Sequence, residues 1–411
     1  MGNASCIGRV GALAAALGIG VALLAAPGVA AAKPSSSSSD GASPTSASPP
    51  TTDSPKHVPS GQNMAVATNG VVRVEKGTAT AISDGQGSVA IARGVDSSAV
   101  ASGGSKAIAR GVGSTAIADV GRCDCASKPN KAIASGDGSV AVAAGSGNTA
   151  IASGEESFAS TIGVNNTATA SGEHSVAIVN GTNNTATASG ANSHAGAFGD
   201  GNTVSAYGQT AVQVDGSDNT VAVHGSEDAD EDHAAVAVVN GDNNDVVVFD
   251  SHNQTLVEGD SNTLTVNSSG TSSSSINDNA SESTIVGDNN VATVQGAISG
   301  VNIHGDGNQA QAGFGGGDTA NYVVIDGNNN VGEAGHGDVN YVGIDGNNST
   351  ATAFGSYQNQ AFVDGDNSTA IAGPGVFNTA TAEGPNSHAG ALGTNSTAEA
   401  GPNETVVVYT P

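Results

Sequence analysis

Two cysteines and one acidic run are the residues whose types and spacing most directly suggest chemistry. Cys123 and Cys125 are separated by a single residue. Redox sites usually have C-x-x-C spacing and a structural zinc ion needs four ligands, so this spacing favours neither use. In an exported chain the two thiols would be oxidised. We therefore expect a small local disulfide between Cys123 and Cys125, and pairing between two chains stays open.

The acidic run is "EDADEDH", residues 227–233. Carboxylate oxygens of this kind bind Ca²⁺ in proteins. The run lacks the spacing of an EF-hand and has no Gly at its centre, which favours a solvated acidic loop. Corners such as "GDNN" at 241–244 and "DGNN" at 326–329 also combine acids and amides, but turn chemistry explains them. We expect no cofactor, with Ca²⁺ as the one alternative left open.

Motifs of catalysis are missing from the sequence. There is no nucleophile motif and no pair of metal-binding histidines, and "GFGGGD" at 313–318 lacks the Lys of a phosphate loop. We expect that the chain is not an enzyme.

Threonines form the remaining candidate site. Thr-x-Thr recurs at an interval of 18 residues, as Thr167 with Thr169 and Thr185 with Thr187, and Thr203 with Ser205 continues the pattern. If these residues share one outward face, they form a regular array of hydroxyl and methyl groups. Such arrays resemble the surfaces of ice-binding solenoids, although Thr also suits exposed strand positions for its own sake.

The elements that would position this array have a fixed period. Gly136, Gly154, Gly172, Gly190 and Gly208 are each 18 residues apart, and each period contains two short alternating segments such as "TATA" and "SVAIV". Strict alternation predicts strands, and the Gly, Asn, Asp and Ser between them predict turns. A short fixed period indicates stacked coils. The sequence therefore predicts an all-β fold, a parallel β-solenoid or β-roll of about 18-residue, two-strand coils.

Inside each coil the pattern predicts which side chains face the core. In "TATA" we expect Ala168 and Ala170 to face inward and the threonines outward, and in "SVAIV" we expect Val176 and Ile178 to face inward. Gly and Asn tolerate the left-handed backbone of tight corners. Corner asparagines one period apart should stack as a ladder along one edge of the solenoid: Asn166, Asn184 and Asn202.

Composition limits the core and the partners. Aromatic residues make up 3% of the chain and Trp is absent, whereas Gly occurs 59 times. A core built mainly from Ala and Val must be thin. The formal net charge of −27 argues against binding to nucleic acid or to anionic lipid, because phosphates would repel the chain.

The N-terminus predicts export. Residues 1–32 resemble a signal peptide: Arg9 precedes the apolar run 11–24, and Ala30–Ala32 offers a cleavage site. Residues 33–63 are rich in Ser, Pro and Thr, which predicts a disordered linker. We divide the rest into two solenoid parts, 64–275 and 276–411, at a Ser-rich break. After cleavage we expect no membrane insertion and a secreted or cell-surface location, in a bacterium judging from the Ala-rich signal.

Residues 87–118, "GSVAIARGVDSSAVASGGSKAIARGVGSTAIA", resemble the head repeats of trimeric autotransporter adhesins. The resemblance extends over about residues 80–220 and implies a β-roll, adhesion and a possible trimer. Those heads use a shorter period and are followed by a stalk and a membrane anchor, which are not visible in this sequence. The nine-residue repeats of calcium-binding β-rolls are also similar, but their calcium-ligating Asp is replaced by Ala or Val.

Together these features predict a structural or adhesive protein of the bacterial envelope or surface that binds an unidentified surface or matrix ligand through many weak contacts. Two alternatives stay open. One is ice binding by the outward threonines, and the other is a β-roll that needs Ca²⁺ to fold.

Overall fold

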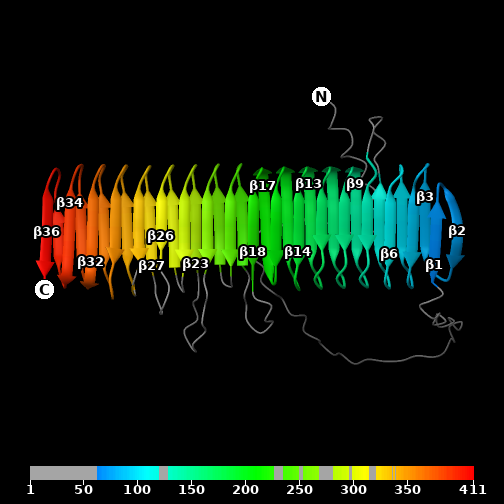
Figure 1. Ribbon diagram of the computed structural model, residues 1–411, viewed down its shortest axis with the longest axis horizontal. Helices are drawn as coiled ribbons and strands as arrows, with labels where there is room; N and C mark the ends of the chain where they lie inside the picture. The colour runs from blue at the N-terminus through cyan, green and yellow to red at the C-terminus, as the bar shows by residue number, and fades with distance from the viewer. Residues whose placement is uncertain are drawn as a thin grey trace, which may run out of the picture. The chain divides into compact units, whose positions relative to one another are not determined.

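The computed structural model describes residues 63–119, 128–225, 235–249, 253–267, 281–295, 299–313, 321–335, 337 and 339–411. These residues form strands and no helix. The strands alternate along the chain between two sheets, and Figure 1 shows them stacked in sequence order as one long ladder. The predicted all-β parallel solenoid with a spacing of about 18 residues is confirmed.

The first sheet consists of β1 and every even-numbered strand, nineteen in all. Its strands are β1 (Met64–Thr68), β2 (Val71–Lys76), β4 (Val89–Arg93), β6 (Lys106–Arg110), β8 (Lys131–Ala134), β10 (Thr149–Ala152), β12 (Thr167–Ala170), β14 (Thr185–Ser189), β16 (Thr203–Tyr207), β18 (Thr220–His224), β20 (Asp245–Phe249), β22 (Thr263–Asn267), β24 (Val291–Gln295), β26 (Gln309–Ala312), β28 (Val331–Gly335), β30 (Thr350–Phe354), β32 (Thr369–Val376), β34 (His388–Thr394) and β36 (Thr405–Thr410).

The second sheet consists of the remaining odd-numbered strands. Its strands are β3 (Thr80–Asp84), β5 (Ser98–Ser102), β7 (Thr115–Asp119), β9 (Val140–Ser146), β11 (Phe158–Val164), β13 (Val176–Thr182), β15 (His194–Asp200), β17 (Thr210–Ser217), β19 (Ala235–Asn240), β21 (Asn253–Glu258), β23 (Ser281–Val286), β25 (Ser299–His304), β27 (Asn321–Asp326), β29 (Tyr341–Asp345), β31 (Gln360–Asp364), β33 (Thr379–Glu383) and β35 (Thr397–Ala400).

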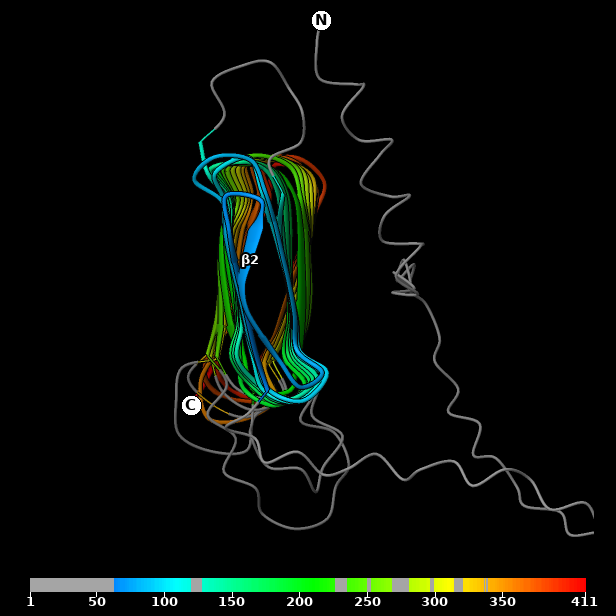
Figure 2. The ribbon, with the colours of Figure 1, turned by 90° about the vertical axis from the view of Figure 1, so that its right-hand side faces the viewer.

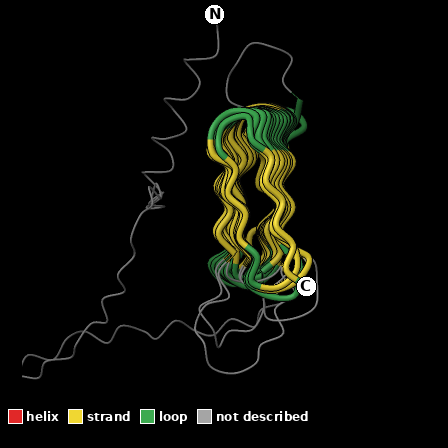
Figure 3. The backbone as a smooth tube through the Cα atoms, turned by 90° about the vertical axis from the view of Figure 1, so that its left-hand side faces the viewer, coloured by secondary structure: helices red, strands yellow, loops and turns green. Residues whose placement is uncertain are grey.

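Successive strands of each sheet are parallel and in register. Thr167 lies beside Thr149 on one side and Thr185 on the other, one coil away in each direction. The start of the ladder differs, because β1 pairs antiparallel with both β2 and β4. Figure 2 looks along the ladder from this end and shows two flat layers that face each other. Figure 3 shows the same layers joined at both edges by turns.

The core lies between the two layers and is one residue deep on each side. In the coil that contains β12 and β13, Ala168 and Ala170 face Ala177 and Val179, and all four are fully buried. The middle of the ladder has larger core residues. These are Val204, Val223, Leu264, Ile285, Ile303 and Ile325. Gly332 then makes room for Ile325 across the core, because a β-carbon at position 332 would lie 3.2 Å from the Ile325 side chain.

The predicted facing is right for the first sheet and wrong for the second. Thr167 and Thr169 face outward as expected, but Val176 and Ile178 also lie on the outer face and are only partly covered. The inward positions of that strand belong to Ala177 and Val179. The phase of β13 follows from the buried Ser175 at the preceding corner, because alternation from a buried Ser175 turns Ala177 and Val179 inward.

The predicted asparagine ladder is present, and it is buried. Asn166 is 1% exposed, and its Oδ1 accepts a hydrogen bond of 2.9 Å from the backbone N–H of Asn184 in the next coil. Its Nδ2 donates to the carbonyls of Ile162 and Gly181, at 2.8 Å each. The amides thus bond mainly to backbone groups of two coils rather than to one another. The corner at Asn166 thereby has its buried amide satisfied, whereas the Nδ2 of the buried Asn63, at the start of the ladder, has no partner among the described residues.

The opposite corner is built around a buried serine. Ser157 and Ser175 each donate a hydrogen bond of 2.8 Å to the carbonyl of the Gly three residues earlier, Gly154 and Gly172. Between Asn340 and Ser387 the two corner types are exchanged, before Ser396 follows Asn378. Ser349, Ser368 and Ser387 continue the first ladder, while Asn340, Asn359 and Asn378 occupy the other edge.

Strand pairing continues on both sides of the expected domain boundary near residue 275. β21 pairs with β23, and β22 pairs with β24, both in parallel. Residues 268–280, which contain the Ser-rich break, lie outside the described residues, as do the expected signal peptide and nearly all of the expected linker.

Candidate functional site

The outward threonines form two columns on the first sheet. The longer column contains Thr149, Thr167, Thr185, Thr203 and Thr220, which are paired directly from strand to strand. The shorter column contains Thr169, Thr187 and Ser205. We call these eight residues the threonine face. All six residues predicted from the sequence therefore lie together on one surface.

The geometry of the threonine face follows from the parallel ladder. Neighbours in a column are one strand apart, about 4.8 Å, and the two columns are two residues apart, about 6.6 Å. The threonine side chains are half-buried or exposed. The outward positions of β10, β12, β14 and β16 carry no charged side chain. The face is therefore a neutral, flat grid of hydroxyl and methyl groups.

Other side chains limit the threonine face at both ends. Lys131 precedes Thr149 in the longer column and Asp245 follows Thr220. In the shorter column, Ile151 precedes Thr169 and Ala222 follows Ser205. The same chemistry thus repeats over five coils in one column and over three in the other.

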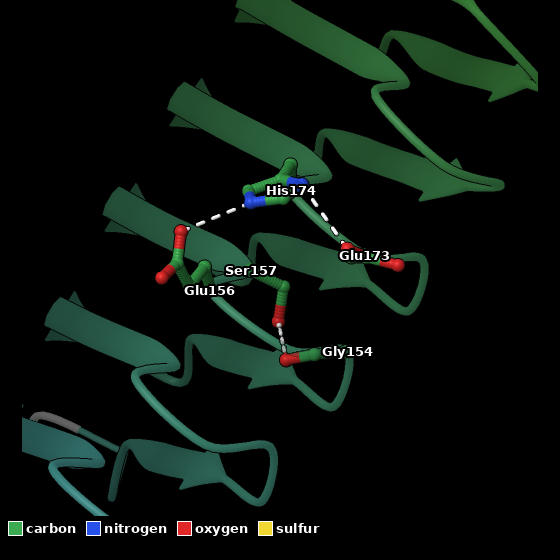
Figure 4. A network of polar contacts seen from close by, with 5 residues as sticks. All are labelled: Gly154, Glu156, Ser157, Glu173 and His174. Carbon is green, nitrogen blue, oxygen red and sulfur yellow. Dashed lines mark hydrogen bonds and ion pairs between the residues drawn. The ribbon is translucent and has the colours of Figure 1, made fainter. Parts of the chain in front are cut away.

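An acidic cluster with one histidine lies at the serine corners. Figure 4 shows His174 between two carboxylates: its Nε2 lies 2.9 Å from Glu156 Oε2, and its Nδ1 lies 3.6 Å from Glu173 Oε1. Glu156 and His174 occupy the same corner position one coil apart, both with left-handed backbone, at φ 50° and 53°. The three side chains are largely exposed. They join two neighbouring coils at the surface, where ion pairs contribute little to stability.

Among the described residues, no three or more His, Cys, Asp or Glu side chains come together to hold a metal ion. Cys123, Cys125 and the acidic run 227–233 lie outside the described residues.

Burial shifts the pKa of two groups on the outer face of the second sheet. Partial burial beside Val176 and Ala211 lowers the pKa of His194, because desolvation disfavours the imidazolium. Burial raises the pKa of Tyr341, and the neighbouring Tyr322 adds to that effect. Tyr341 stacks on Tyr322 with ring centroids 5.7 Å apart, and on its other side it contacts Phe362. The three rings form a short aromatic ladder.

A basic surface on the outer face of the first sheet was not predicted from the sequence repeats. The outward charged residues of β4, β6 and β8 are all basic: Arg93 pairs with Arg110, and Lys106 pairs with Lys131. The signal was visible in the sequence, since no Lys or Arg follows Lys131. The net charge of the whole chain concealed this local excess of positive charge.

Comparison with known proteins gives one match. The sequence model of a family described as "Protein of unknown function (DUF3060)" matches residues 179–235, a minor part of the chain. No curated protein matches. No solved structure matches either. None of the described residues belongs to a helix long and apolar enough to cross a membrane.

Proposed function

We propose that the chain is an exported structural or adhesive protein of the bacterial envelope or surface, and that it binds an extended ligand through repeated weak contacts. The observation that carries this proposal is the register of the threonine face. Thr149, Thr167, Thr185, Thr203 and Thr220 present the same contact once per coil. A repeating ligand can occupy several such contacts together, and avidity then replaces one deep site.

The export sequence and the linker support the same role. The apolar run 11–24 would direct the chain out of the cell, and residues 33–63 would give the solenoid reach from an anchoring point. The likeness of residues 87–118 to adhesin heads points to adhesion and leaves a trimer open. The assembly state is therefore part of the proposal to be measured.

The test is adsorption of residues 33–411 to the insoluble envelope of the organism that encodes the chain. Thr167, Thr185 and Thr203 are replaced together by Glu. The matched control replaces Thr379, Thr381 and Thr397, which face outward on the second sheet, and changes the charge equally. We expect at least tenfold weaker adsorption for the first variant and a change within about twofold for the control. Equal losses in both variants, or catalytic turnover of a defined glycan, would contradict the proposal.

Ice is a second candidate ligand, favoured by the two-column grid. Thr167, Thr169, Thr185 and Thr187 form a flat, uncharged rectangle with spacings of about 4.8 and 6.6 Å. Ordered water could match such a rectangle. Ice binding predicts thermal hysteresis that disappears when these four residues are replaced by Lys. A wild-type chain without hysteresis would exclude this ligand.

A further inference from the structure

Charge is segregated along the chain. All eleven Lys and Arg residues lie at or before Lys131, whereas most of the 38 Asp and Glu residues follow it. The solenoid therefore has a basic first section and an acidic remainder. At physiological ionic strength charges are screened beyond about 8 Å, so each section acts on its surroundings separately.

The basic section presents two columns of cations on the outer face of the first sheet. Arg93 and Arg110 form one column, and Lys106 and Lys131 form the other. We call these four residues the cation columns. Each of the four is exposed, with Ile91 and Ile108 in the strip between the columns. Among the described residues, ion pairs within 4.0 Å are made only by His174, so the cation columns have no anionic partner there.

The acidic section has a matching feature on the second sheet. Asp326, Asp345, Asp364 and Glu383 are paired strand to strand over four coils. We call them the carboxylate column. All four are exposed. Like charges directly opposite each other on neighbouring strands destabilise a sheet. Both kinds of column are therefore unfavourable in an isolated chain.

We propose that the cation columns of one copy bind the carboxylate column of a second copy. The two arrays have the same pitch of one strand, about 4.8 Å, because both follow the same parallel ladder. A column of two cations laid along two neighbouring carboxylates at equal pitch meets an opposite charge at each of its two coils. The contact also relieves the repulsion within each array. The partner is thus defined by charge complementarity between two parts of this chain.

This contact has a consequence for the form of the assembly. The two arrays lie on different sheets and in different sections of the solenoid, so the interface is not two-fold symmetric. A pair of chains leaves one array of each kind free, and further copies can add. The assembly should grow with concentration instead of stopping at a dimer. This contact between copies uses neither the threonine face nor its ligand. The contact can therefore be tested independently of the proposed function.

The experiment is sedimentation velocity of residues 33–411 at several concentrations, in 0.15 M and 0.5 M NaCl, each with and without EDTA. One variant carries Lys106→Glu and Lys131→Glu, and another carries Asp345→Lys and Asp364→Lys. A matched control carries Asp200→Lys and Glu399→Lys, two exposed acids outside the carboxylate column. Circular dichroism of each variant verifies that the strands are retained.

We expect concentration-dependent association of the wild type in 0.15 M NaCl, weakened at least tenfold in 0.5 M. Each charge-reversed variant alone should stay monomeric, and the control should associate like the wild type. A mixture of the two reversed variants should associate again, because the new Glu and Lys arrays complement each other.

Three outcomes would overturn the proposal. One is a wild type that is monomeric at every concentration. Another is association that survives both charge reversals or needs a divalent cation that EDTA removes. The last is a monomeric wild type that binds vesicles of anionic lipid through Lys106 and Lys131, which would assign the cation columns to a lipid surface.

Discussion

At the scale of single residues, the corners depend on buried amides. The side chain of Asn166 makes three hydrogen bonds of 2.8–2.9 Å, two as donor and one as acceptor, and reaches backbone groups of its own coil and the next. A water molecule has no access to these groups at 1% exposure. The amide therefore gives the N–H of Asn184 a partner and donates to two strand-end carbonyls, of Ile162 and Gly181.

Removal of this amide should be costly. Asn166→Ala removes three hydrogen bonds and leaves the buried N–H of Asn184 without its acceptor, and we expect a loss of about 3 kcal/mol in the free energy of unfolding. The measurement is urea denaturation followed by circular dichroism. The matched control is Asn180→Ala, an exposed side chain on β13, which should change stability by less than about 0.5 kcal/mol. Equal effects of the two substitutions would mean that the buried ladder adds no stability.

His194 gives the solenoid a predicted pH dependence. Its pKa in the folded chain is below the ordinary value of 6.5. The unfolded chain therefore binds the proton more readily, and the contribution of His194 to stability is complete above pH 6.5 and falls as the pH drops below it. We expect the urea midpoint to decrease between pH 7.5 and 5.5 by more in the wild type than in His194→Gln. The difference between the two proteins removes the effect of carboxylates common to both. An identical decrease in both would contradict the assignment.

At the scale of elements, glycine sets how closely coils can stack. Gly181 has left-handed backbone, φ 130°, and a β-carbon there would overlap the carbonyl oxygen of Gly199 in the next coil. Gly163 and Gly199 have the same relation to the coils above them. Both the backbone conformation and the space thus exclude any side chain at this corner position.

Two glycines close in sequence test this requirement. Gly181→Ala should destabilise the chain by about 3 kcal/mol or more, because the obstacle is backbone that cannot move without unstacking the coils. Gly196 has ordinary backbone, and a β-carbon there would lie 3.1 Å from the ring of Phe198, which can turn aside. Gly196→Ala should therefore cost less than about 1 kcal/mol. The measurement is the thermal unfolding midpoint of each of the two variants, compared with that of the wild type. A milder effect at position 181 than at 196 would refute the stacking argument.

The 18-residue period predicted the corners well, whereas the alternation within strands predicted the facing of side chains less well. The 18-residue period placed Asn166, Asn184 and Asn202 at one corner, because an exact repeat must stack like on like. Alternation alone does not say which alternate set of side chains in a strand faces the core. Because large residues are preferred in a core, we predicted that Val176 and Ile178 face inward, and this prediction is wrong. The buried Ser175 and Ala177 beside them show the true phase, which turns Val179 inward and Val176 and Ile178 outward.

Two further features could not be read from local repeats. The exchange of corner types near Ser349 does not change the alternation of residues in the strands. The exchange therefore cannot be predicted from that alternation. The cation columns depend on which distant residues become neighbours. Lys106 and Lys131 are 25 residues apart in sequence because residues 120–127 interrupt the period, yet they pair directly. A period of 18 would not have matched them.

At the scale of the whole molecule, the solenoid turns short motifs into long surfaces. One coil presents Thr167 and Thr169 on its outer surface, and the neighbouring coils present equivalent residues along the threonine face. The same repetition produces the cation columns and the carboxylate column, to which we assign a different contact by proposal. Weak single contacts are thus converted into extended arrays, and the number of coils in each array determines its strength.

By the proposed function, the threonine face binds by the sum of equal contacts. We would therefore measure the affinity of residues 33–411 for the insoluble envelope as Thr149, Thr167, Thr185 and Thr203 are replaced by Val one after another. Valine keeps the shape and the strand preference but removes the hydroxyl. If each hydroxyl contributes one hydrogen bond, the affinity should fall about two- to fivefold at each step, whichever threonine is replaced first. Complete loss after a single replacement, or no loss after four, would contradict this account.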